Sequence, residues 1–119
     1  MPNFTVEHQE NFKSEYADAY IAEWAEISAA ITTGDALEKV QLTDRTVQMT
    51  GTWDGATIVM QGSLDGVTYF TLTDPQGNAL SFTADGLESV MEATRFIRPF
   101  RSVAGGGTVD VKVILLYKE

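Results

Sequence analysis

The chain has 119 residues, a length that suits one domain with a single hydrophobic core. Its formal net charge of −9, from 17 acidic and 8 basic residues, argues against binding to nucleic acid or to an anionic membrane surface. It has no cysteine, which excludes disulfides, thiolate metal sites and thiol catalysis. There is neither a signal peptide pattern nor an apolar run of about 20 residues, so we expect a soluble protein made in the cytoplasm.

The acidity is concentrated near the N-terminus. Residues 1–44 carry nine acidic and two basic side chains, whereas residues 45–119 carry eight and six. We expect residues 1–19 to form an extended N-terminal arm and residues 20–119 to form the folded domain. The arm either packs along its own domain or reaches a neighbouring subunit. A core of this size does not obviously need the aromatic residues in and just after the arm. We therefore take these as candidate partner contacts: Phe4, Phe12, Tyr16 and Trp24.

The first half of the domain is expected to be β-structure. Residues 20–31 contain alanine and glutamate, which favour helix. However, apolar and acidic side chains alternate along this segment, and the segments that follow are all β-prone, so we expect a strand. Residues 33–35 read as a turn. Residues 46–50 alternate between apolar and polar side chains, which predicts that Val47 and Met49 are buried.

Turn signals then divide the chain at short intervals. Asp-Gly pairs at 54–55 and 65–66 stand between β-prone runs and predict two tight type I′ hairpins. Between them we expect a central strand at 56–62, with residues 68–72 as its partner. Residues 74–77, Asp-Pro-Gln-Gly, predict a further β-turn.

The last third is expected to return to strands after one interruption. Residues 84–91 break the alternation and predict one short helical turn that bridges two sheets. A strand at 94–103 contains Pro99, which predicts an edge position or a kink. Three glycines at 105–107 predict a turn into a long final strand at 108–117. Seven to eight short strands predict an all-β fold, a single antiparallel β-sandwich of Ig-like or jelly-roll-like type.

The residues offer little catalytic or metal chemistry. His8 is the only histidine and lies in the arm, so a Ser-His-acid triad or a zinc site lacks partners. Four aspartates in turns could suggest calcium, but they lack the spacing of an EF-hand, and local backbone hydrogen bonding explains them. We therefore predict no catalytic residue, no cofactor, no metal and no enzymatic activity.

Three arginines lie close together in the sequence at positions 95, 98 and 101. They could bind an anion, but pairing with the acidic first third of the chain is the favoured interpretation. If those acids belong to a second copy, the charge asymmetry promotes assembly. Arg98 and Arg101 are therefore further candidate partner contacts.

Turn motifs from Asp44 to Pro99 carry a resemblance to a known group of proteins. These motifs are Gly51 to Thr57, Gly62 to Gly66, Asp74 to Asn78, and Arg98-Pro99. The segment resembles small β-sandwich proteins of tailed bacteriophages that are encoded among virion structural genes. It covers about half of the chain, and the N-terminal third is longer and more acidic than in that pattern.

This resemblance implies a virion component, above all a capsid cement or decoration protein that binds between major capsid subunits on the outer shell, with a trimer favoured. A tail or neck adaptor is the alternative within the virion. A carbohydrate-binding module is a further alternative, because residues 63–69 and 95–98 look superficially like segments of galactose-binding-like domains. In that case Trp53 and Tyr69 are the candidate sugar contacts.

Overall fold

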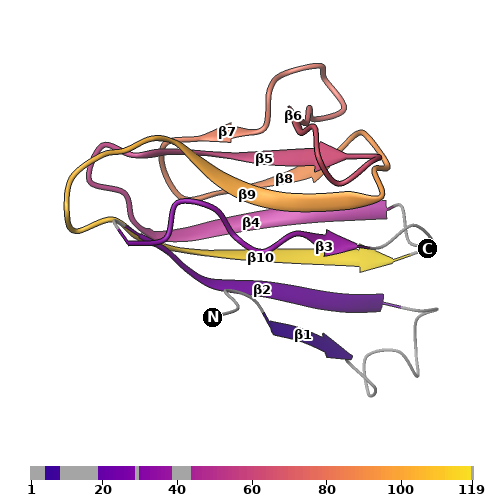
Figure 1. Cartoon of the computed structure of the whole chain (residues 1–119), viewed down its shortest axis with the longest axis horizontal. Coiled ribbons are helices and arrows are strands. Elements are labelled where there is room, and N and C mark those ends of the chain that lie inside the picture. The colour runs from indigo at the N-terminus through magenta and orange to yellow at the C-terminus, as the bar shows by residue number, and fades with distance from the viewer. Residues whose placement is uncertain (1–4, 9–18, 29, 39–43, 119) are drawn as a thin grey trace.

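The computed structural model describes residues 5–8, 19–28, 30–38 and 44–118, which form two antiparallel sheets (Figure 1). The first sheet has the order β1 (Thr5–His8), β2 (Ala19–Ser28), β10 (Asp110–Lys118), β4 (Asp44–Thr52) and β8 (Gly86–Val90). The second has the order β3 (Leu37–Glu38), β9 (Phe96–Val103), β5 (Thr57–Ser63) and β6 (Phe70–Thr71), and β7 (Ser81–Phe82) also pairs with β5. The predicted all-β sandwich is confirmed, with ten strands in the described residues instead of seven or eight. No helix long and apolar enough to cross a membrane occurs in these ranges.

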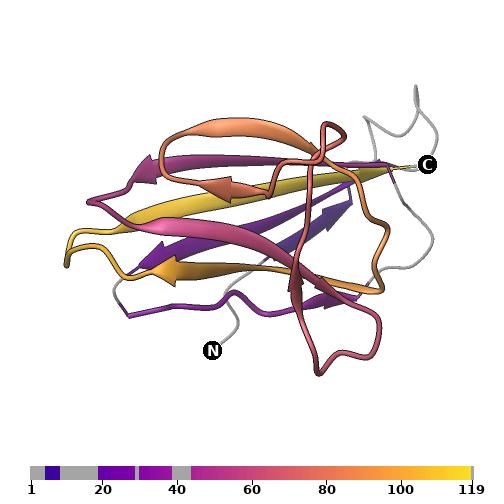
Figure 2. The same cartoon turned by 90° about the horizontal axis from the view of Figure 1, so that it is seen from above.

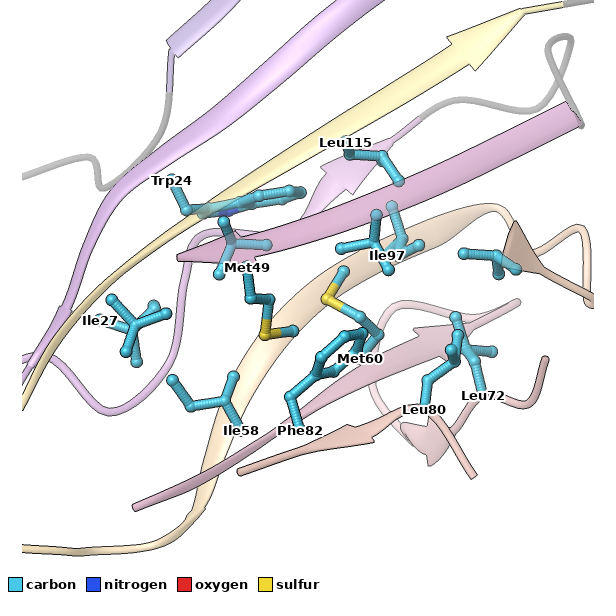
Figure 3. Close-up of a cluster of buried hydrophobic side chains, with 14 of the residues drawn as sticks. Trp24, Ile27, Met49, Ile58, Met60, Leu72, Leu80, Phe82, Ile97 and Leu115 are labelled. Carbon is cyan, nitrogen blue, oxygen red and sulfur yellow. The ribbon is translucent and has the colours of Figure 1, made fainter. Parts of the chain in front are cut away.

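The core lies between the two sheets, where alternate side chains of each strand meet. Val47 and Met49 are fully buried as predicted, because odd positions of β4 face inward. Met49 lies opposite Ile58 and Met60 of β5 in the layer that Figure 3 shows. This single apolar layer holds the two sheets together.

Trp24 belongs to this core, so the prediction that it contacts a partner is wrong. Its side chain has no exposed surface, and its indole Nε1 donates a hydrogen bond to the carbonyl oxygen of Asp35 at 2.8 Å. A Cβ atom at Gly34 would lie only 2.4 Å from Trp24 Cδ1. The indole thus fills the space between β2 and the segment that leads to β3, and the core does need it.

The Asp-Gly turn at residues 54–55 has the predicted backbone but a different role. Asp54 has φ of 46° and Gly55 has φ of 82°, as a type I′ turn requires, and the Ala56 N–H donates to the Trp53 carbonyl at 2.8 Å. However, β4 and β5 belong to different sheets. The turn therefore carries the chain from one sheet to the other and closes no hairpin.

Residues 84–91 form no helical turn, which corrects the prediction. Residues 86–90 are strand β8, which pairs with β4 in a register that places Leu87 opposite Gln48. Leu87, Val90 and Met91 have the spacing of one helical face, but Leu87 and Met91 are 63% and 61% exposed. Backbone pairing with the open edge of β4 takes precedence over that spacing.

Pro99 lies in an interior strand, so the predicted edge position or kink is also wrong. β9 runs between β3 and β5, and the Pro99 carbonyl accepts a hydrogen bond from the Gly34 N–H at 3.1 Å. The Pro99 nitrogen therefore faces Gly34 and not β5. Its partner on β5, Met60, bonds through its own backbone to Leu72 and Leu80 instead. Proline has no backbone N–H, but this absence costs the β5–β9 ladder no hydrogen bond.

Replacing Trp24 with alanine is expected to lower the free energy of unfolding by about 3–5 kcal/mol, because it empties a large buried volume. Chemical denaturation monitored by circular dichroism measures the change. Leu87→Ser, at an exposed position on β8, serves as the control and is expected to stay within about 0.5 kcal/mol of the parent. Equal stability of Trp24→Ala and the parent would contradict a core role for the indole.

Candidate protein-docking surface

The loop between β5 and β6, residues 64–69, presents large apolar side chains to solvent. Leu64 is 71% exposed, Val67 is 82% exposed, and Phe70, which begins β6, is 68% exposed. In Figure 2 this loop projects beyond the strands. We call these three residues the loop surface. Apolar side chains gathered in one exposed place commonly mark a site of interaction with another molecule.

The Asp65 side chain holds the loop in shape through hydrogen bonds. Its Oδ1 accepts hydrogen bonds from the backbone N–H groups of Thr68 at 2.9 Å and Val67 at 2.8 Å, and from Ser63 Oγ at 2.9 Å. These bonds, led by that from Thr68, hold the pKa of the Asp65 carboxyl at about 2, below its ordinary value of 3.8. The Gly66 N–H donates to Ser63 Oγ at 2.9 Å, and Gly66 adopts φ of 78°.

The predicted hairpin is therefore confirmed, but its predicted tight turn is wrong. β5 and β6 do pair, with Gly62 opposite Phe70, yet residues 64–69 separate them. The Asp65 carboxylate accepts hydrogen bonds from the backbone of the loop. These bonds compete with the backbone hydrogen bonds of a two-residue turn. The wider loop gives Leu64 and Val67 room to point outward.

A hollow of about 380 Å³ lies beside the loop surface, with Leu64, Phe70 and Leu72 in its lining. Asp65 and Glu92 also line it. The Glu92 carboxylate accepts hydrogen bonds from Thr73 N–H at 2.8 Å and from Thr73 Oγ1. Burial raises the pKa of Glu92, but these two bonds outweigh it, so the pKa lies below its ordinary value.

Arg98 lies next to this loop on the outer face of the second sheet. Its Nε donates to Gln61 Oε1 at 3.0 Å, and its guanidinium carbon is 3.7 Å from the centre of the Tyr69 ring. Stacking on an aromatic face and one hydrogen bond fix the guanidinium in place. Tyrosine and arginine are residue types enriched in binding hot spots.

The structure does not bring Arg101 to this place. In the register with β5, Arg98 is opposite Gln61, whereas Arg101 is opposite the buried Ile58 and so lies on the other face of the sheet. Its guanidinium donates to the Ala104 carbonyl and to Thr32 Oγ1. Arg101 therefore forms hydrogen bonds within its own chain, at the border of the sandwich.

The predicted pairing with the acidic first third is confirmed for Arg95. This residue forms an ion pair with Glu38 at 2.7 Å within the same chain. Both side chains are about half exposed, so the pair contributes little to stability.

Most of the arm lies outside the described residues. Residues 5–8 form β1, which pairs with β2 of its own domain, with Val6 opposite Ala22. Phe4, Phe12 and Tyr16 are among the residues that the structure does not describe. Their contact with a partner stays a prediction.

The two candidate sugar contacts do not form one site. Trp53 is half-buried against the core and its Nε1 donates to Asp85 Oδ1 at 2.9 Å. Tyr69 stacks on Arg98. One residue precedes β5 and the other follows it, so the two rings belong to opposite ends of that strand.

Turn aspartates form hydrogen bonds to nearby backbone, as the sequence suggested. Asp74 Oδ1 accepts from the N–H groups of Gln76 and Asn78, both at 2.9 Å. Among the described residues no group of three or more His, Cys, Asp and Glu side chains could hold a metal ion.

The sequence reasoning missed Leu64, Val67 and Phe70. It placed Leu64 and Val67 at the ends of a tight turn and Phe70 inside a paired strand, so none was considered as a surface residue. The available signal was the presence of apolar residues on both sides of an Asp-Gly pair, where a turn normally carries polar ones.

Comparisons with models of protein families and with curated proteins give no match. A comparison with solved structures finds the SPBc2 prophage-derived protein YomS, with a TM-score of 0.55 over 98% of this chain and 94% of that chain. The two chains share a fold. Their sequence identity is 16%, so the likeness extends to the fold alone.

Asp65 is expected to titrate at about pH 2 in a carbon-detected NMR titration of its carboxyl group. Because its folded pKa is below the ordinary value of 3.8, its contribution to loop stability is present above about pH 4 and is lost as the pH falls towards 2. In Asp65→Ala, amide exchange at Val67 and Thr68 should be faster than in the parent, whereas Asp110→Ala should leave it unchanged. A midpoint close to 3.8 would show that the loop is not held by this carboxylate.

Proposed function

We propose that the chain is a non-enzymatic structural protein of a tailed-phage virion. Within the virion it acts as a capsid cement or decoration protein, which binds between major capsid subunits and stabilises the head shell. The loop surface is the observation that carries this proposal, since exposed apolar side chains gathered in one place commonly mark a site of protein binding. The turn motifs from Asp44 to Pro99 and the fold shared with a prophage-derived protein support a phage origin.

The loop surface has the physical properties that protein binding requires. Burying a large apolar side chain contributes about 1.5–3 kcal/mol, so Leu64, Val67 and Phe70 together can supply useful affinity. The Asp65 hydrogen bonds fix the loop before binding, which lowers the entropy lost on association. Arg98, held by Tyr69 and Gln61, adds an ordered cation beside these apolar groups.

The proposal predicts that a variant with Leu64, Val67 and Phe70 all changed to serine binds expanded heads of the encoding phage at least tenfold more weakly than the parent. Cosedimentation with purified heads measures this. The matched control is Leu87→Ser with Met91→Ser, which removes exposed apolar side chains from β8 and from the residue that follows it, and should bind as the parent does. Equal binding by both variants would exclude the loop surface, and binding to tails or necks instead of heads would replace the cement assignment with an adaptor.

We further propose that the protein is a homotrimer whose N-terminal arm contributes to the contact. β1 lies at the edge of the first sheet and pairs with β2, so the arm is attached at the border of the domain. Light scattering is expected to give three times the 13.0 kDa mass of one chain, and a single-chain mass after deletion of residues 1–19. A single-chain mass for both proteins would contradict the trimer but would leave head binding to be judged by cosedimentation.

A further inference from the structure

The hollow beside the loop surface combines an apolar wall with negative charge. Leu64, Phe70 and Leu72 supply apolar surface, and Asp65 and Glu92 supply carboxylates. None of the residues in its lining is basic. A volume of about 380 Å³ is at the lower end of the range for ligand pockets and can hold one long side chain.

Both carboxylates keep capacity to accept further hydrogen bonds. The three bonds to Asp65 all use Oδ1, which leaves Oδ2 for an outside donor. Each oxygen of Glu92 accepts one bond from Thr73, although a carboxylate oxygen can accept two. The two groups are ionised at neutral pH, because their intramolecular hydrogen bonds favour the charged form.

The base of the hollow is preformed. A Cβ atom at Gly62 would lie 2.6 Å from Thr94 Oγ1 and 2.7 Å from Leu72 Cδ2, so glycine at this position allows both side chains to pack closely. Thr94 Oγ1 also donates to the Phe96 carbonyl at 2.7 Å, which fixes its orientation. An incoming group therefore meets ordered walls.

We infer that this hollow is a socket for a cationic side chain with an aliphatic stem, a lysine or arginine of the partner protein. The stem packs on Leu64, Phe70 and Leu72 while the cationic head bonds to Asp65 and Glu92. Charge complementarity supports a basic occupant, because a chain of net charge −9 repels an acidic one. The inference rests on the proposed function for the identity of the partner as a protein.

Small analogues of single side chains test the socket directly. Nα-acetyl-lysine methylamide is titrated into the full-length protein, and amide shifts are followed by NMR. We expect shifts at residues 63–70 and at Thr94, with a dissociation constant on the order of millimolar and a norleucine analogue, which lacks only the ammonium group, binding about fivefold more weakly. The arginine analogue, run in the same way, identifies the preferred head group. Equal binding of lysine and norleucine analogues, or shifts confined to other parts of the protein, would overturn the socket.

Isosteric variants separate a specific contact from general attraction. Asp65→Asn and Glu92→Gln remove one charge each, and each should weaken binding of the lysine analogue about threefold to fivefold. The Asn oxygen can still accept the bonds that Asp65 Oδ1 accepts, and the Gln oxygen can still accept from Thr73 N–H while its NH2 group donates to Thr73 Oγ1. Asp110→Asn removes the same charge outside the hollow and should leave binding unchanged. Equal weakening by Asp110→Asn would overturn the socket. If the analogue fails to bind while the protein still binds heads, only the socket is excluded; if the analogue binds but the protein does not bind heads, only the proposed function is excluded.

Discussion

The structure depends on how the chain crosses between its two sheets at one end of the sandwich. The β4–β5 and β9–β10 connections both cross there (Figure 1). Asp54 joins them, because its carboxylate accepts hydrogen bonds from the N–H and Oγ1 of Thr108, and its carbonyl accepts from the Gly106 N–H. Asp85 holds the same region by accepting from Gly51 N–H and Trp53 Nε1. Strands that follow one another in the sequence therefore enter different sheets, and the inner faces of the two sheets enclose one core.

The opposite end of β5 takes no part in these crossings between sheets. On the side away from β9, β5 pairs with β7 at Ile58 and Val59 and with β6 at Gln61 and Gly62, so two short strands cover that edge. The loop after β5 joins strands of the same sheet and has no crossing to make. Its apolar side chains are therefore not required to close the core, and they remain at the surface.

Local patterns predicted local geometry well, but not the partners of each strand. The alternation at residues 46–50 identified the buried face of β4, and the Asp54-Gly55 pair identified a turn with positive φ. Neither pattern says which strand lies alongside, since that depends on contacts between distant residues. The same limit explains Trp24, whose burial depends on Gly34 and Asp35 across the sandwich. The loop surface was missed because Asp65 was taken as part of a tight turn, whereas its side chain supports a wider loop.

The net negative charge acts against non-specific association through the exposed apolar surface. Exposed Leu64, Val67 and Phe70 would promote non-specific association in a neutral chain, and a net charge of −9 disfavours such non-specific contacts through this surface. The carboxylates of Asp65 and Glu92 extend this negative charge to the hollow itself. A partner with basic side chains experiences the opposite effect, since a negative field attracts it. In the binding mode that we propose, the apolar groups supply binding energy, while the carboxylates determine which surface can approach them.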